Sequence, residues 1–256
     1  MSEKTFRERV RRLVLAIRNP LLPTQSREHL QALRLREIEI VSRYLPECGR
    51  LLEIGAGSGW QSRELSLRGY DVSSIDIPES NFSGQREWPV IDYDGRNIPF
   101  SSKSFDIVFS SNVLEHIPHV REFQSEIRRV LKDDGIAVHL VPSAGWRFWT
   151  NLTHPIRYWT PPIRHGEHAS NALSEVLAFR RRTWKKLFVE TGWQVEMCAP
   201  TGLFYTGCSV ADHCLSIRSR ERLARFAGSA CNIFVLRKGK SAMALEPGDR
   251  AHTPVT

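Results

Sequence analysis

A glycine-rich segment that joins a short apolar run to an amphipathic run limits most strongly what this chain can fold into. The run Leu51–Ile54 is followed by Gly55, Gly57 and Gly59 at alternate positions. Glycine is needed where a chain turns sharply and where a ligand approaches the backbone with no Cβ in the way. A turn of this kind between a strand and a helix lies beyond the carboxyl end of a parallel strand, where doubly wound sheets bind ligands.

Two acidic residues flank this turn. Glu53 precedes the first glycine by two positions, and Asp76 follows it by about 20 residues, at the end of the next apolar run. An acid at the end of the second strand can accept hydrogen bonds from ribose hydroxyls. A purely structural turn is the alternative, and the flanking acids disfavour it.

The glycine spacing also separates two kinds of cofactor. A nicotinamide or flavin enzyme would carry its third glycine at position 60 and hold a pyrophosphate at the helix N-terminus. Position 60 is Trp60, the last glycine comes one residue earlier, and an acid stands upstream. Because the acid suits a cationic ligand without phosphate, the pattern argues against a dehydrogenase.

From residue 50 onward, short apolar strands alternate with helices, which predicts an α/β fold with a mostly parallel sheet and helices on both faces. The strands are expected at 50–54, 71–75, 90–93, 107–110, 136–141, 193–198 and 232–237. The helices are expected at 26–45, 60–67, 120–131, 181–191 and 210–227.

Three segments follow from this pattern. Residues 1–46 are expected to form an N-terminal helical cap, 47–239 the α/β domain and 240–256 a disordered polar tail. Within the domain, residues 143–180 are rich in aromatic residues, prolines and histidines, and they interrupt the alternation. A loop of about 35 residues at this point is long enough to suggest a substrate-side insertion.

Composition bounds the location of the protein. No run approaches the roughly 18 apolar residues of a membrane span, and the basic N-terminus lacks the apolar core and cleavage site of a secretory signal. Five cysteines are scattered without a CxxC spacing, which fits reduced thiols in a cytoplasmic protein. These cysteines are Cys48, Cys198, Cys208, Cys214 and Cys231.

The net charge of +8 is compatible with nucleic acid, an anionic membrane or an acidic substrate, and also with an ordinary basic surface. A basic amphipathic helix is expected at about residues 6–17. Packing of this helix on its own domain is favoured, and peripheral contact with an anionic membrane is the alternative.

Four motifs in order resemble the class I S-adenosylmethionine-dependent methyltransferases, specifically the small-molecule enzymes related to those of quinone biosynthesis. They are LLEIGAGSG at 51–59, SSIDIP at 73–78, the run from DGRNIPF to VLEHI at 94–117, and IRRVLKDDGIAVHLVPS at 127–143. The resemblance covers about residues 48–142. It implies a Rossmann-like, doubly wound sheet of seven strands with an antiparallel last strand, and S-adenosylmethionine as cofactor. Asp133–Gly135 departs from the usual proline-glycine-glycine turn, which we expect to alter only the turn before the fifth strand.

The resemblance also implies a set of cofactor-binding residues. They are Glu53, Gly55, Gly57, Gly59, Asp76, Asp94, Gly95 and Asn112. Glu53 and the first three glycines would line the methionine and ribose portion. Asp76 would bind both ribose hydroxyls, Asp94 the adenine amino group, and Asn112 would lie beside the methionine moiety.

Methyl transfer from a sulfonium is an in-line displacement with an activated donor, so that alignment in a dry site is the main task. An oxygen nucleophile of high pKa also needs a general base, most often histidine. The candidates are His116, His154 and His165, for which local packing is the alternative. His165 and His168 with Glu167 lack a firm third ligand spacing, so no metal is expected.

We therefore expect a methyltransferase that acts on a small-molecule or glycan- or lipid-linked acceptor, with oxygen as the methylated atom. A non-catalytic cofactor-binding module is one alternative. A nucleic-acid methyltransferase is another, although the tetrapeptide typical of base amino-group methylation is absent at Ser110–Val113. No specific nucleic-acid partner is therefore expected. The sequence does not determine the acceptor or the oligomeric state.

Overall fold

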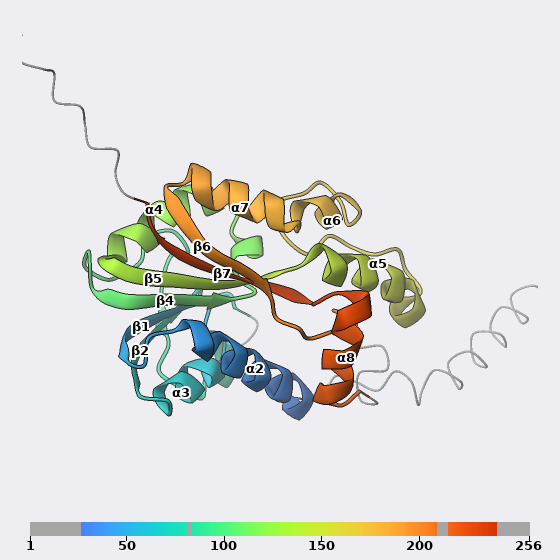
Figure 1. Cartoon of the computed structure of the whole chain (residues 1–256), viewed down its shortest axis with the longest axis horizontal. Helices are drawn as coiled ribbons and strands as arrows, with labels where there is room; N and C mark the ends of the chain where they lie inside the picture. Colours follow the sequence, from blue (N-terminus) through green and yellow to red (C-terminus); the bar gives the residue numbers. More distant parts are fainter. Residues whose placement is uncertain (1–26, 81–82, 209–214, 240–256) are drawn as a thin grey trace, which may run out of the picture.

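A computed structural model describes residues 27–80, 83–208 and 215–239 (Figure 1). Its centre is a seven-stranded sheet with the order β3-β2-β1-β4-β5-β7-β6. The strands are β1 Gly49–Ile54, β2 Tyr70–Asp76, β3 Ile91–Asp92, β4 Phe105–Ser111, β5 Leu131–Pro142, β6 Trp193–Pro200 and β7 Cys231–Lys238. Because β7 runs antiparallel to both of its neighbours and the other pairs are parallel, the predicted Rossmann-like sheet is confirmed.

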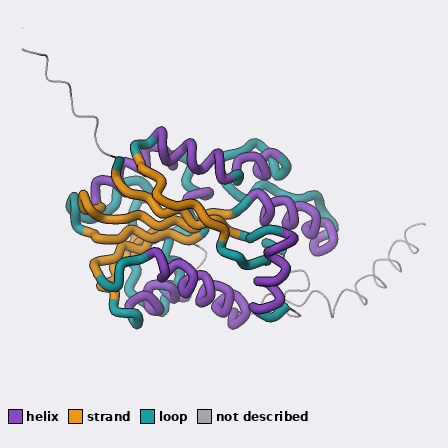
Figure 2. Tube along the Cα trace, viewed as in Figure 1, coloured by secondary structure: helices purple, strands orange, loops and turns teal. Residues whose placement is uncertain are grey.

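Helices cover both faces of the sheet, so that the helices and strands form three layers (Figures 1 and 2). One face carries α2 and α3, and the opposite face carries α4 and α7. Their bounds are α2 Arg27–Val41, α3 Trp60–Ser66, α4 Val120–Val130 and α7 Arg181–Glu190. Successive strand residues point to opposite faces, so Leu51 packs with the α2 side and Leu52 with the α4 side. Both residues are fully buried, as expected for a sheet covered on two sides.

Three more helices lie at the end of the sheet where β5 finishes (Figure 1). They are α5 Ala144–Tyr158, α6 Ser174–Ala178 and α8 Ile217–Ala227. The expectation that 143–180 is a loop is therefore wrong for much of that range.

Local capping explains why α5 forms despite its unfavourable composition. The Oγ atom of Ser143 accepts a hydrogen bond from the backbone N–H of Trp146 at 2.9 Å, which caps the first turn. Trp146, Thr150 and His154 are buried at intervals of four residues, so α5 has a face that packs on the protein. Pro155 lies in the last turn, near the end of the helix.

The fifth strand also differs from the sequence-based prediction. It begins at Leu131, and Asp133–Gly135 lies inside it instead of in a turn before it. The pairing with β4 shifts between Phe105 opposite Leu131 and Ile107 opposite Ile136, so that β5 holds extra residues there. Such a bulge keeps a strand paired while its excess residues leave the ladder.

Some expectations fall on residues that lie outside the described part of the chain. These are the amphipathic helix at 6–17, the tail at 240–256 and residues 210–214 of the helix before β7. The described helix of that region, α8, begins after Ser216, whose Oγ accepts from the backbone N–H of Ser219 at 3.2 Å. Within the described ranges, no helix has the length and apolar character needed to cross a membrane.

Candidate active site

The glycine turn joins β1 to α3 and adopts backbone angles that favour glycine. Gly55, Gly57 and Gly59 have φ values of +72°, +60° and +78°. A Cβ atom on Gly55 would lie 2.3 Å from a methyl carbon of Val113, in the segment that follows β4. The turn therefore leaves no room for a side chain at its first glycine, and it brings the ends of β1 and β4 into contact.

Asp76 ends β2 beside this turn and holds it in place. Its Oδ2 atom accepts the backbone N–H of Gly57 at 2.7 Å, and its Oδ1 atom accepts that of Ile77 at 2.8 Å. The side chain is mostly buried, with the residue 8% exposed. A carboxylate offers about four lone-pair sites, so Asp76 keeps capacity for ligand hydroxyls beyond these two bonds.

Glu53 lies deeper, behind the turn. It is buried, and its carboxyl group accepts a hydrogen bond from the Ser62 hydroxyl on α3, which in turn accepts one from Ser74 at 2.7 Å. Burial raises the pKa of Glu53 to about 8 despite the bond from Ser62, and the negative charge of Asp76 adds to the rise. The two acids expected to flank the turn are thus electrostatically coupled, and a nearby cation would favour the ionised form of Glu53.

Asp94 and Gly95 follow β3 in a tight turn. The Oδ1 atom of Asp94 accepts the backbone N–H groups of Arg96 at 2.8 Å and Asn97 at 2.7 Å. Hydrogen bonds from Asn97 lower the pKa of Asp94 to about 2, so this exposed carboxyl group is ionised at neutral pH. Gly95 contributes its carbonyl oxygen, which lies 3.0 Å from Nε2 of His119.

Asn112 follows β4 directly and has a left-handed backbone, with φ at +56°. Its backbone N–H donates to the carbonyl oxygen of Leu140 at 2.9 Å. The thiol of Cys231, the first residue of β7, donates to its Oδ1 atom at 3.2 Å. These contacts fix the Asn112 side chain between the ends of β4 and β7.

Sequence reasoning missed a set of residues that connects Asn112 to helix α2. The hydroxyl of Tyr205 lies 3.1 Å from the Cys231 sulfur and donates to Glu37 on α2 at 2.6 Å. Arg34 pairs with the same Glu37 at 2.5 Å. Burial raises the pKa of Tyr205 and of Cys231 well above their ordinary values, so both stay neutral. No local sequence signal marks this set, because its members lie on three separate segments.

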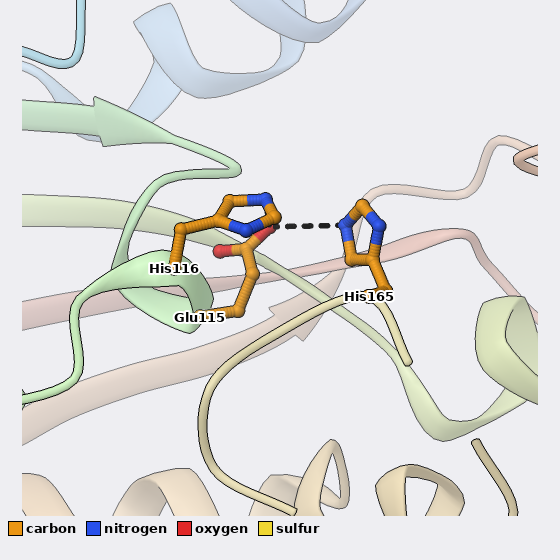
Figure 3. Close-up of side chains that lie close together, drawn as sticks. All are labelled: Glu115, His116 and His165. Atoms are coloured by element: carbon orange, nitrogen blue, oxygen red, sulfur yellow. Dashed lines mark ion pairs between the residues drawn. The ribbon is translucent and has the colours of Figure 1, made fainter. Parts of the chain in front are cut away.

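Two of the three predicted catalytic histidines meet at one acid. Glu115 lies in the short 3-10 helix Leu114–His116, and Figure 3 shows its carboxyl group beside the ring of His116, with one oxygen facing the ring of His165. Nε2 of His116 is 3.8 Å from Oε1 of Glu115, and Nε2 of His165 is 4.0 Å from the same atom. The two ring centroids are 4.6 Å apart.

Burial dominates the electrostatics of this cluster, which we define as Glu115, His116 and His165. It raises the pKa of Glu115 to about 8, against the opposing charge of Arg34. It lowers the pKa of His165 to about 4, with further lowering by the charge of His116, and it lowers the pKa of His116. Both imidazoles are therefore neutral at physiological pH.

A buried acid supports the backbone that carries His165. The Oε1 atom of Glu175 accepts the backbone N–H groups of His165 at 2.8 Å and of Gly166 at 2.6 Å. Arg147 on α5 pairs with Oε2 of Glu175 at 2.6 Å, with both side chains almost fully buried. The segment 165–167 is also tied to the cluster, since the backbone N–H of Glu167 donates to the carbonyl oxygen of Glu115 at 2.8 Å.

The structure does not bring His154 to this cluster. His154 lies eight residues after Trp146, whose ring centroid is 4.8 Å from that of His165, so it is about 12 Å farther along α5. Its Nδ1 atom lies 3.1 Å from the carbonyl oxygen of Thr160.

The residues weighed as metal ligands in the sequence, His165, His168 and Glu167, also point apart. Nε2 of His168 lies 3.0 Å from the carbonyl oxygen of Leu114, and Glu167 pairs with Arg164 at 2.9 Å. Glu115 and His116 are the residues that join His165 instead.

Comparison with known proteins identifies the family. A family model described as a methyltransferase domain matches residues 6–197. The chain belongs to this methyltransferase family. The match covers most of the chain and agrees with the glycine turn, the acid that ends β2 and the order of the strands.

Curated relatives match this methyltransferase over part of their length. The biotin biosynthesis bifunctional protein BioHC of Cellvibrio japonicus is 36% identical over 102 residues, which are 37% of this chain and 20% of that protein. A malonyl-[acyl-carrier protein] O-methyltransferase of Legionella pneumophila is 28% identical over 40% of this chain and 37% of its own length. A ubiquinone biosynthesis O-methyltransferase of Rickettsia bellii is 27% identical over 34% of this chain and 40% of its own length. The chain thus spans less than half the length of each.

Solved structures share the fold of this methyltransferase. An S-adenosylmethionine-dependent methyltransferase from Mesorhizobium loti superposes with a TM-score of 0.54 at 16% identity, over 79% of this chain and 98% of that one. Another, from Aquifex aeolicus, superposes with a TM-score of 0.51 at 14% identity, over 87% of this chain and 95% of that one. The chain thus holds a methyltransferase domain with the fold of class I S-adenosylmethionine-dependent enzymes, which disfavours the dehydrogenase alternative.

The residues at the carboxyl ends of β1 and β2 fit this cofactor. Gly55 presents bare backbone where a Cβ atom would collide with Val113, and Asp76 keeps acceptor sites for two ribose hydroxyls. Glu53 places a second carboxyl group behind the turn, where a positively charged ligand would favour its ionised form.

Proposed function

We propose that this methyltransferase transfers the methyl group to an oxygen atom of a small-molecule or glycan- or lipid-linked acceptor, which binds at the cluster of Glu115, His116 and His165. The observation that carries the proposal is the position of the cluster. It begins three residues after Asn112 at the end of β4, and residues 165–167 close over it from the segment that follows α5. Two of the relatives are O-methyltransferases, which supports oxygen as the methylated atom.

The proposed roles of the cofactor-side residues are those that the family resemblance implies, and their positions at the ends of the strands support them. Asp76 binds the ribose hydroxyls, Asp94 the adenine end and Asn112 the methionine end, while Glu53 and the glycines shape the turn beneath the ligand. Bound S-adenosylmethionine supplies a methyl group on a positively charged sulfur. Alignment of donor and acceptor in such a site is worth several kcal/mol of the barrier, about 7 or more when the geometry is ideal.

The acceptor side completes the reaction. The hydroxyl of the acceptor gives up its proton to a neutral imidazole nitrogen of the cluster, and its oxygen forms a bond to the methyl carbon. The carbon–sulfur bond breaks in the same step, and its electron pair stays on sulfur.

The outer face of α5 favours an acceptor with an apolar part. Phe148, Leu152 and Ile156 are each about half exposed and form one stripe along this helix, because they are spaced four residues apart. Because this stripe lies on the side of α5 opposite Trp146 and the cluster, it would contact only the part of a lipid-linked acceptor that extends beyond the cluster.

The test is to identify the methylated product. The purified protein is incubated with methyl-labelled S-adenosylmethionine and metabolite and lipid extracts of its source, with an Asp76→Ala protein as the control that cannot hold the donor. We expect the label on an oxygen atom of a metabolite or lipid-linked compound, only with the unaltered protein. Label on a nitrogen or carbon atom, or in nucleic acid, would contradict the proposal.

A further inference from the structure

The cluster of Glu115, His116 and His165 has the ligand set of a metal site. One atom from each of the three side chains can be chosen so that all lie within 4.8 Å of one another. Figure 3 shows the carboxyl group beside the ring of His116, and a dashed line joins one of its oxygens to a ring nitrogen of His165. Glu115 and His116 lie in the 3-10 helix after β4, and His165 lies in the segment that follows α5. The fold therefore brings the three residues together.

The carboxyl group of Glu115 gives an independent reason to expect a ligand. The side chain is fully buried, and neither of its oxygens has a hydrogen-bond partner within the described ranges. A buried acceptor without a partner costs free energy, so such groups in proteins usually have an ion, a water or a functional role. Arg34 contributes an opposing charge, but it is paired with Glu37 at 2.5 Å. A cation held at the two imidazoles would supply the missing partner of Glu115.

The donor atoms indicate which cation fits. Two imidazole nitrogens and one carboxylate oxygen are the protein ligands of catalytic Zn²⁺ sites, which keep a fourth position open. Mg²⁺ and Ca²⁺ prefer oxygen ligands. At Zn²⁺ distances of about 2.0–2.2 Å, tetrahedral ligands lie roughly 3.4 Å apart, so the three side chains need to approach one another by about 1.4 Å at most. The side chains of His116 and His165 are 45% and 35% exposed, which gives the rings freedom to do so.

The residues around the cluster hold the ligands in position. Glu175 and its partner Arg147 fix the backbone at His165 and Gly166. A Cβ atom on Gly166 would lie 2.6 Å from the carbonyl oxygen of Glu115, so the two segments are in close contact there. Outer contacts of this kind commonly orient the ligands of metal sites.

We propose that Glu115, His116 and His165 bind one divalent transition-metal ion of the Zn²⁺ type, with its fourth position open to the acceptor oxygen. The role in catalysis rests on the proposed function above. A hydroxyl bound to such an ion loses its proton to solvent more readily, and the resulting oxygen anion attacks the methyl carbon while sulfur keeps the electron pair. In that form the two histidines are ligands, the metal ion is a Lewis acid that lowers the pKa of the bound hydroxyl, and solvent accepts the proton.

Metal binding is measured on the full chain after removal of metals with a chelator. Calorimetry with Zn²⁺ and visible absorption with Co²⁺ are compared for the unaltered protein and for His116→Ala, His165→Ala and Glu115→Gln. The control is His168→Gln, which alters a histidine of the same segment and retains a hydrogen-bonding group toward Leu114. His116 and His165 are only partly buried, so their removal carries less risk to the fold than that of Glu115, which keeps the test valid if the buried Glu115 variant is unstable.

We expect one Zn²⁺ per chain, a tetrahedral Co²⁺ spectrum without a thiolate band, and affinity reduced more than about 100-fold in each ligand variant but not in His168→Gln. Absence of stoichiometric binding, or unreduced affinity in His116→Ala or in His165→Ala, would overturn the proposal. The same experiments distinguish a failure of the proposed function from a failure of the metal site. A protein that binds Zn²⁺ as expected but methylates no oxygen acceptor refutes that function alone, and one that methylates oxygen without binding metal refutes only the metal site.

Discussion

The thiol of Cys231 donates to Oδ1 of Asn112 at 3.2 Å, so the first residue of β7 is bonded to the residue that follows β4. Through Tyr205 and Glu37 this contact extends to α2. The helix that precedes the sheet is therefore linked by polar side chains to a residue expected beside the cofactor. The link gives α2 a role in shaping the site as well as in covering the sheet.

Removal of the Tyr205 hydroxyl, which lies in the middle of this link, should make the protein less stable. Tyr205→Phe leaves the buried carboxyl of Glu37 without one of its hydrogen-bond donors, so we expect the free energy of unfolding to fall by about 1–3 kcal/mol. Urea unfolding measures the change. The matched variant is Tyr158→Phe at an exposed position, which should alter stability by less than about 0.5 kcal/mol. Equal effects of the two changes would show that the link contributes nothing.

The glycine turn should not tolerate a side chain at its first position. In Gly55→Ala the new methyl would lie 2.3 Å from Val113 on a backbone with φ at +72°, so the turn must move. We expect loss of measurable S-adenosylmethionine binding in calorimetry. Gly84→Ala is the control, because a Cβ there meets nothing within 4 Å. Normal binding by the Gly55 variant would mean that the turn is not the cofactor site.

Buried His139 should make the protein less stable in acid. Burial lowers its pKa to about 3, whereas the unfolded chain binds the proton near the ordinary value of 6.5. Between these values the unfolded state binds more protons, so stability falls as the pH decreases from 6.5, by up to about 1.4 kcal/mol per pH unit. In His139→Asn the slope of unfolding free energy against pH should be shallower from pH 6 to 4. The same slope in both proteins would contradict this.

Alanine variants of the three predicted histidines should differ in turnover. His165→Ala and His116→Ala should reduce turnover about 100-fold or more and leave the dissociation constant of S-adenosylmethionine within about twofold, because they act on the acceptor side. His154→Ala should change neither, since its ring nitrogen lies against the Thr160 carbonyl oxygen and far from the cluster. A turnover defect confined to His154→Ala would place the acceptor elsewhere along α5.

The cofactor side of the site could be predicted from sequence because its signals are local. The glycine turn, Glu53 and Asp76 each lie at the end of an apolar run, and parallel strands bring their carboxyl ends to one edge of the sheet. The parallel sheet with helices on both faces follows from the alternation of strands and helices.

The acceptor side could not be predicted in the same way. Glu115 and His165 are 50 residues apart in the sequence. The residues near Glu115 give no sign that its carboxyl group is buried and has no hydrogen-bond partner in the described ranges. Helix α5 was missed because aromatic residues and Pro155 suggested a loop. Ser143 as an N-cap was the signal that could have found it.

The most direct test of the account is the affinity of the Asp76→Ala protein for S-adenosylmethionine, measured by calorimetry beside an Asp71→Ala control on the same strand. Asp71 is exposed and only pairs loosely with Arg50, at 3.4 Å. Loss of two hydrogen bonds to a charged acceptor, at about 1.5–3 kcal/mol each, should weaken binding by about 100-fold or more in Asp76→Ala, while Asp71→Ala binds normally. Unchanged affinity in a folded Asp76→Ala protein would contradict the assignment of the cofactor site.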